Sequence, residues 1–139
     1  MPTPLLPTNN GIATLSHVSY EVSDIDRSLM FYAALGFFEV TRREEAGMGT
    51  KVFLGPPGAD VFGAQFELLR PESGQLPELG AAHRHIALRS SDFDGTLARL
   101  IALGIVPISA STNVQSVGPR ICMVEDPDGY GIELIEAER

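Results

Sequence analysis

The sequence predicts an α+β fold built from two tandem βαβββ modules. Three observations lead to this prediction. The chain contains an internal repeat, each copy begins with the pattern of a strand followed by that of an amphipathic helix, and each copy ends with three further short apolar runs. The length of 139 residues is that of about one domain, so we expect both modules to share a single domain over residues 13–139.

The repeat is clearest where each copy begins. Residues 17–40 and 85–108 align without a gap at an offset of 68, and eight of the 24 aligned positions are identical. Near the end of each copy, Glu67 and Glu133 lie in similar apolar runs, FELL and IELI, at an offset of 66. Because only two copies are present, the sequence indicates an internally duplicated domain and not a solenoid.

The module boundaries follow from the composition between the copies. The first module spans residues 13–70 and the second residues 83–139. Residues 71–82 carry two prolines and two glycines, which are typical of a linker. Residues 1–12, with three prolines, are expected to form an extended N-terminal arm.

Each copy opens with a strand and a helix. Residues 18–22 alternate between apolar and polar side chains as a half-buried strand does, and the second copy repeats the pattern. Ser23–Asp24 and Ser91–Asp92 supply oxygens for a helix N-cap, and Gly36 and Gly104 end the helices. The apolar stripes of the two helices consist of Ile25, Leu29, Tyr32 and Ala33, and of Phe93, Leu97, Leu100 and Ile101. The further strands are expected at residues 37–40, 52–54 and 65–69, then at 106–108, 121–124 and 131–135.

Charge and composition exclude several classes of function. The net charge of −8 and the pI near 4.7 argue against a nucleic-acid groove or an anionic membrane surface as the partner. No apolar stretch approaches the roughly 20 residues of a membrane-spanning helix, and the first residues lack the pattern of a signal peptide. A single cysteine excludes an intrachain disulfide and fits a reducing compartment. We therefore expect a cytoplasmic protein that binds a small molecule.

Four potential metal ligands share one strand parity. His17, Glu67, His85 and Glu133 each alternate with apolar neighbours that face the helix, so each points to the opposite side of its sheet. Two imidazoles and two carboxylates suit a divalent transition metal. A lone histidine or glutamate at such a position is usually just solvated, but here the same pair recurs in both copies. His83 has the same parity as His85 and is an alternative ligand if the strand begins earlier.

Three further polar residues are candidates for binding a substrate. Arg89 shares the parity of His85, and Gln65 that of Glu67. If the turn EDPDGY placed Glu125 opposite Tyr130, then Cys122 would oppose Glu133 and Arg120 would lie on the same face. Either arginine could hold a carboxylate, or simply lie at the rim of the cleft. Cys122 is expected to pack as a small buried residue and not to act as a nucleophile.

Two segments, ELGAAHRHIAL at 78–88 and VEDPDGYGIELIE at 124–136, resemble the vicinal oxygen chelate superfamily, and within it bacterial glyoxalase I. The resemblance covers nearly the whole chain after residue 12, and the intervals of 50, 18 and 48 between the four ligands are similar to those of that family. It implies the vicinal oxygen chelate fold, in which mixed, curved sheets of the two modules form a metal-binding cleft, often as a homodimer that shares its sites between subunits. It also implies one divalent ion per site, such as nickel, cobalt, zinc, manganese or iron, held by His17, Glu67, His85 and Glu133.

The same resemblance implies a reaction. Glu133 is the expected base, with Glu67 as the other catalytic carboxylate, and the substrate is the hemithioacetal of methylglyoxal and glutathione, isomerised through a metal-stabilised enediolate. Two departures bear on glutathione as co-substrate. Glu21 stands where the family has an arginine for a glutathione carboxylate, and Pro71 replaces an asparagine. The carboxylate of Glu21 would repel a glutathione carboxylate. The sequence therefore supports the metal centre better than it supports glutathione as the co-substrate.

Other functions remain open at this point. An epimerase of the same superfamily would use the same four ligands and the same proton transfer. An extradiol-type dioxygenase is less favoured, because it uses two histidines and one carboxylate and keeps the fourth position open. A non-catalytic protein that sequesters a drug would generally lack the metal ligands, all four of which are present in this chain.

Overall fold

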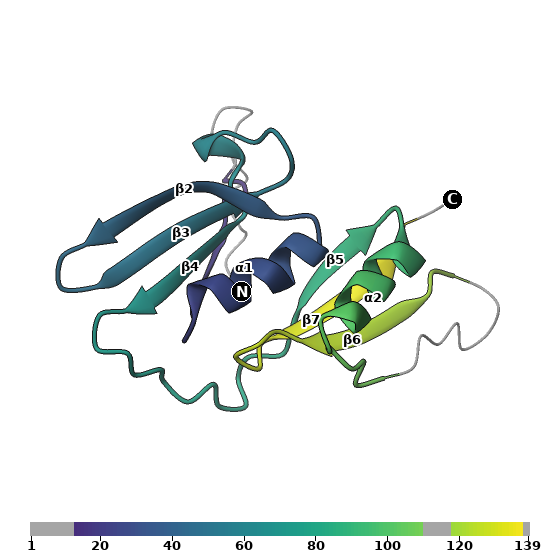
Figure 1. The fold of residues 1–139 in the computed structure, drawn as a ribbon. Coiled ribbons are helices and arrows are strands. Elements are labelled where there is room, and N and C mark those ends of the chain that lie inside the picture. The colour runs from purple at the N-terminus through teal and green to yellow at the C-terminus, as the bar shows by residue number, and fades with distance from the viewer. Residues whose placement is uncertain (1–12, 110–117, 138–139) are drawn as a thin grey trace, which may run out of the picture.

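The computed structural model describes residues 13–109 and 118–137 and contains two mixed sheets and two α-helices (Figure 1). The first sheet has the strand order β1-β4-β3-β2 and the second the order β5-β7-β6. The elements are β1 Val18–Glu21, α1 Ile25–Ala34, β2 Phe38–Glu45, β3 Gly49–Gly55, the short 3-10 helix η1 Val61–Gly63, β4 Phe66–Pro71, β5 Ile86–Ser90, α2 Phe93–Ala102, β6 Ile121–Glu125 and β7 Gly131–Glu136. The arm expected at residues 1–12 lies outside the described residues.

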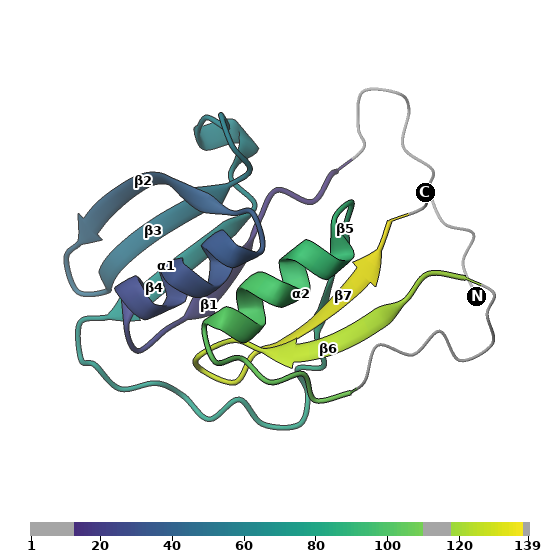
Figure 2. The same cartoon turned by 45° about the vertical axis from the view of Figure 1, so that its right-hand side comes forward.

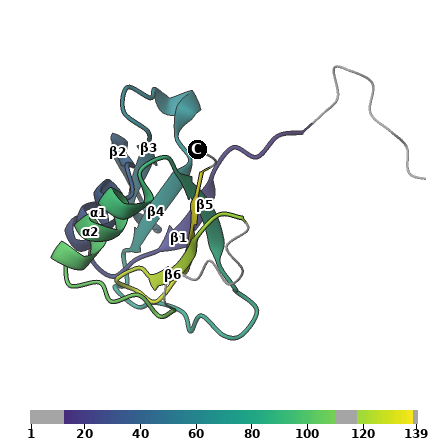
Figure 3. The same ribbon diagram turned by 90° about the vertical axis from the view of Figure 1, so that its right-hand side faces the viewer.

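Both modules have the same connectivity. In each, the first strand runs parallel to the last one, β1 with β4 and β5 with β7, and the other pairings are antiparallel. The helices α1 and α2 lie side by side on the same side of the two sheets (Figures 2 and 3). Within residues 13–109 and 118–137, neither α-helix covers the opposite face of a sheet. Among the described residues, no helix is long and apolar enough to cross a membrane.

The helix boundaries confirm the expected signals. The side chain of Asp24 accepts a hydrogen bond of 3.0 Å from the backbone N–H of Arg27, and that of Asp92 accepts one of 3.1 Å from the N–H of Gly95. Just beyond each helix, Gly36 and Gly104 adopt φ values of 95° and 81°, which glycine reaches at little cost.

The second sheet has one strand fewer than expected. Residues 106–108 form no strand, although the N–H of Ile108 donates to the carbonyl of Met123 at 2.8 Å. Pro107 has no N–H to contribute to a ladder, which limits pairing at this edge. The prediction of a strand at 106–108 is therefore wrong for this segment.

The register between β6 and β7 also differs from the expectation. Glu125 pairs with Gly131, so Met123, and not Cys122, lies opposite Glu133. The reason is a larger turn, in which the carboxylate of Asp126 accepts the backbone N–H groups of Asp128 and Tyr130, each at 2.9 Å.

The shift also settles the environment of Cys122. This residue pairs with Leu134 and is fully buried, and burial raises the pKa of its thiol. A buried thiol with a raised pKa is a poor nucleophile, as the sequence predicted.

A single hydrophobic core joins the two modules. It contains Tyr20, Tyr32 and Phe66 from the first module and Leu100 and Ile132 from the second. Most of the predicted helix stripes are buried or half-buried, with one exception. Ile101 is 54% exposed, because Phe93, Thr96 and Leu100 provide the buried side of α2.

Candidate metal centre

The first pair of predicted ligands meets at the parallel pairing of β1 with β4. His17 comes just before β1, and Ser19 pairs with Glu67 in this register. The Nε2 atom of His17 lies 3.2 Å from Oε2 of Glu67, on the side of the sheet away from α1. Phe53 on β3 pairs with Glu67 on β4. The Phe53 ring meets the His17 ring edge-on, with 5.8 Å between the ring centroids. The two ligands of this module are therefore held together by the sheet itself.

The second pair repeats this geometry in the second module. His85 comes just before β5, and Ala87 pairs with Glu133 on β7. The Nε2 atom of His85 lies 2.7 Å from Oε2 of Glu133. Gly131 permits this approach, because a Cβ atom there would lie 2.6 Å from the carbonyl oxygen of Arg84 and 3.4 Å from Cβ of His85.

The four ligands form two separate pairs within one chain. Among residues 13–109 and 118–137, no group of three or more histidine, cysteine, aspartate or glutamate side chains is close enough to hold an ion. Each pair nevertheless combines one ring nitrogen with one carboxylate that is mostly covered. Each module thus presents one half of a set of two histidines and two glutamates, which suits a divalent transition metal.

His83, the alternative to His85, belongs to a different cluster. Its ring meets those of Tyr20 and Tyr130 edge-on at 5.7 Å each, and these two tyrosines stack on each other at 4.1 Å. The structure therefore pairs His85, and not His83, with Glu133. The role of His83 is to hold the end of the linker against both modules.

Sequence reasoning missed two cations beside the first pair. The Nζ atom of Lys51 lies 2.8 Å from Oε2 of Glu45 and 3.8 Å from Oε1 of Glu67. The hydrogen bond from Lys51 is the main reason why the pKa of Glu45 is lowered. The guanidinium of Arg43 lies 5.3 Å from the centre of the Phe53 ring. The signal was available, because Lys51 and Phe53 alternate with the buried Val52 and Leu54.

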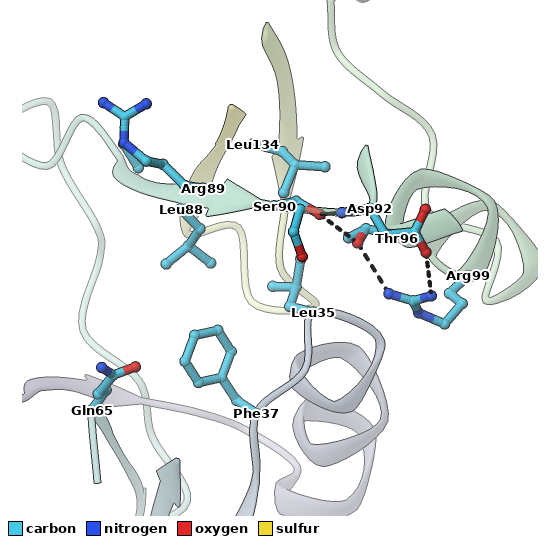
Figure 4. A pocket seen from close by; sticks show the side chains of 12 residues that line it. Leu35, Phe37, Gln65, Leu88, Arg89, Ser90, Asp92, Thr96, Arg99 and Leu134 are labelled. Carbon is cyan, nitrogen blue, oxygen red and sulfur yellow. Dashed lines mark hydrogen bonds and ion pairs between the residues drawn. The ribbon is translucent and has the colours of Figure 1, made fainter. Parts of the chain in front are cut away.

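Gln65 and Arg89 line a cavity of about 390 Å³ between the modules (Figure 4). Leu35 and Phe37 close one side of this cavity, and the guanidinium of Arg89 points away from them. A hydrogen-bond network at the start of α2 occupies the other side, where Ser90 and Arg99 both bind the Thr96 hydroxyl, at 2.9 and 3.0 Å. These polar groups are engaged with each other and stabilise the helix start.

Arg120 does not reach the face of Glu133. Its guanidinium forms ion pairs with Asp94 at 2.8 Å and Glu136 at 3.1 Å, and it lies 4.7 Å from the centre of the Phe93 ring. Asp94 and Phe93 belong to α2, so Arg120 points to the helix side of the second sheet. The expectation that Arg120 shares the face of Glu133 failed because it assumed a register shifted by one residue.

Comparison with known proteins shows the family of this chain. Residues 14–134 match the sequence model of the Glyoxalase/Bleomycin resistance protein/Dioxygenase superfamily. A probable lactoylglutathione lyase of Synechocystis sp. is 32% identical over 124 residues, which cover 88% of this chain and 94% of that protein. The lactoylglutathione lyase of Haemophilus influenzae is 33% identical over 122 residues, 86% of this chain and 90% of that protein.

Solved structures of similar fold include proteins with different described roles. The trypanothione-dependent glyoxalase I of Leishmania major is 27% identical with a TM-score of 0.74, covering 90% of this chain and 87% of that one. The antibiotic binding protein TnmS3 from Streptomyces sp. is 26% identical with a TM-score of 0.65, covering 92% of this chain and 98% of that one.

Proposed function

Because the chain belongs to the glyoxalase/bleomycin resistance protein/dioxygenase superfamily, we propose that it is a glyoxalase I-like, metal-dependent lyase acting on a small molecule in the cytoplasm. The observation that carries this proposal is the recurrence of one histidine–glutamate pair at equivalent places in both modules. A protein that only sequesters a drug has no use for these two pairs.

The donor set fits a divalent transition ion. We propose that His17 and Glu67 of one chain and His85 and Glu133 of a second copy hold one ion in a homodimer, since the pairs of a single chain do not form one cluster. In this arrangement the modules 13–70 and 83–139 are the units contributed by each subunit. When bound, the ion supplies Lewis acidity that lowers the free energy of a negative charge on substrate oxygens.

The chain's own residues then move the proton. Glu133 accepts the proton from the carbon next to the substrate carbonyl and returns it to the neighbouring carbon, which isomerises the substrate. Glu67 is the equivalent carboxylate of the other module. Each histidine Nε2 atom lies within 3.2 Å of an oxygen of its glutamate partner, so the two donor atoms of a pair already point to the same place.

The thiol carried by the substrate is a separate matter. The relatives are named lactoylglutathione lyases, which supports a hemithioacetal of methylglyoxal as the substrate class. Glu21 places a negative charge where an arginine would favour the glutathione carboxylate. We therefore expect weaker use of glutathione than in enzymes that have the arginine.

The first prediction concerns Glu133→Gln. This change removes the proposed base and one ligand, so we expect the rate of lactoylglutathione formation to fall by a factor of about 10²–10⁴. Nickel content should also fall, measured by mass spectrometry of the purified protein. Glu39→Gln, the same change at a carboxylate that pairs with Arg42 on the helix side of the first sheet, should alter neither quantity.

The possible results separate the alternative functions. Bound metal without lyase activity would favour an epimerase that uses the same four ligands. A protein that binds none of nickel, cobalt, zinc, manganese and iron, and whose properties do not change in Glu133→Gln, would overturn the proposal in favour of a binding protein similar to TnmS3.

A further inference from the structure

The chain has one lysine, and it lies beside the first ligand pair. Lys51 is the only lysine among ten basic residues of the Lys and Arg types. Its side chain is only 12% exposed, which is unusual for a residue that normally stays in water. Its Nζ atom is 3.8 Å from Oε1 of Glu67, on the sheet face that carries no helix.

A second cation and an aromatic ring complete this surface. Arg43 pairs with Lys51 across β2 and β3, and its guanidinium lies over the ring of Phe53. Phe53 in turn pairs with Glu67 on β4. Two positive charges therefore flank an apolar ring directly beside one of the proposed metal ligands.

The carboxylates nearby do not use up these charges. Glu45 binds Lys51 at 2.8 Å and lies 3.8 Å from Arg43 through the same Oε2 atom, so one carboxylate serves two cations. The other carboxylate, Glu67, is committed to the metal in the proposed function. One positive charge is then left without a covered partner.

We propose that Lys51, assisted by Arg43, binds a carboxylate that the substrate carries close to the metal. This inference rests on the proposed metal site. Because Nζ is 3.8 Å from a ligand oxygen, the acid group belongs to a short substrate, with about one or two carbons between it and the chelating oxygens.

The position of Glu21 agrees with this assignment. Glu21 makes the end of β1 unfavourable for an anion, whereas Lys51 makes the face of β3 favourable for one. The anionic group of the substrate is therefore expected at β3, and this shift separates the chain from enzymes that bind a glutathione carboxylate beside the first strand.

The test compares two small chelators with nickel-loaded protein. Malate and 2-hydroxybutyrate both offer a hydroxyl and a carboxylate to the metal, but only malate has a second carboxylate in place of a methyl group. We expect malate to bind at least tenfold more tightly in calorimetric titrations. In protein labelled with [13C]lysine, the single lysine signal of the NMR spectrum should shift with malate and stay in place with 2-hydroxybutyrate.

Three variants test whether Lys51 is responsible. Lys51→Met should bind both compounds with similar, weak affinity while its nickel content stays at the wild-type level. Lys51→Arg should keep the preference for malate. Arg42→Met is the matched control, because Arg42 pairs with the buried Val52, so it shares the helix side of the sheet, and forms its ion pair with Glu39 at 2.9 Å. It should keep the wild-type preference.

The outcomes separate this inference from the metal site. Equal binding of both compounds to nickel-loaded protein, with a stationary lysine signal, would overturn the anion site and leave the metal site intact. If the protein bound none of nickel, cobalt, zinc, manganese and iron, the proposed function would fail, and malate titrated into the unloaded protein would decide the role of Lys51 from its NMR signal. If Lys51→Met did not fold, the lysine signal of the wild type and the preference of Lys51→Arg for malate would still decide whether Lys51 binds the carboxylate.

Discussion

At the scale of single residues, Asp126 has the most unusual environment. It is only 4% exposed, and its carboxylate accepts hydrogen bonds from the Tyr32 hydroxyl and from two backbone N–H groups. Burial raises the pKa of Asp126 above its usual value, although these hydrogen bonds act in the opposite direction. Tyr32 belongs to the first module and Asp126 to the second, so this one carboxylate joins both halves of the duplication.

The raised pKa predicts how stability depends on pH. Because the folded-state pKa of Asp126 lies above the unfolded-state value, its contribution to stability is complete below the unfolded pKa and is lost as pH rises through the folded pKa. In Asp126→Asn this loss cannot occur. The quantity to measure is the free energy of unfolding of the wild type minus that of Asp126→Asn, from urea titrations. We expect this difference to be larger at pH 3.5 than at pH 7. A difference that does not change with pH would contradict the raised pKa.

The donor to Asp126 can be removed separately. Tyr32 is fully buried and its hydroxyl donates to Oδ2 of Asp126 at 2.9 Å. Tyr32→Phe leaves the ring in place but removes this donor from a buried carboxylate. We expect the free energy of unfolding to fall by about 1–3 kcal/mol, measured by chemical denaturation at pH 7. A change within a few tenths of a kcal/mol would show that water replaces the hydroxyl.

At the scale of elements, the parallel strand pairs β1–β4 and β5–β7 position the two histidine–glutamate pairs. Their registers place each glutamate two residues further along the ladder than the position of its histidine, so the same local pairing produces the same ligand pair twice. The second pair additionally requires the close approach of β5 to Gly131.

Gly131→Ala should open this second pair. The added Cβ would lie 2.6 Å from the carbonyl oxygen of Arg84, so the segment that carries His85 must move away from β7. We expect nickel affinity to fall at least tenfold, measured by competition with a chromogenic chelator. Gly36→Ala is the control. An alanine at the φ of 95° found there destabilises the end of α1 by roughly 1–2 kcal/mol, and this position is remote from both histidine–glutamate pairs. Equal affinities in both variants would show that the approach at Gly131 is not needed.

Much of this organisation was predictable from the sequence, for a physical reason. Alternation along a strand fixes the face of each side chain, so the parity of His17, Glu67, His85 and Glu133 could be read directly. Alternation does not fix the size of a turn: the Asp126 hydrogen bonds to the N–H groups of Asp128 and Tyr130 enlarge the turn and shift Arg120 to the other face. Alternation also gives the face of Lys51, but its contact with Glu67 depends on the tertiary pairing of β3 with β4.

At the scale of the whole molecule, the two histidine–glutamate pairs of one chain remain apart. Among the described residues each histidine has one glutamate partner, and no larger group forms. The proposed site of four ligands requires a second copy of the chain, and this proposal can be tested without any knowledge of the substrate.

Mixing two inactive variants tests the shared site. In a dimer whose sites each combine the first module of one chain with the second module of the other, a His17→Ala chain and a His85→Ala chain together form one intact site. After free exchange of subunits, we expect tightly bound nickel at about a quarter of the wild-type level, compared with almost none for either variant alone. No recovery in mixtures shown to contain heterodimers would place each site within one chain.

The stacking of Tyr20 on Tyr130 has a consequence for synthesis of the protein. The Tyr130 hydroxyl also donates to the carbonyl of Glu21, a contact that spans 109 positions of the chain. The side of Tyr20 that faces Tyr130 is therefore covered only after the second module has been synthesised, whereas Phe66 of the first module is available earlier. We expect a chain truncated before β6 to leave this side of Tyr20 exposed and to be cleaved by proteases faster than the full chain.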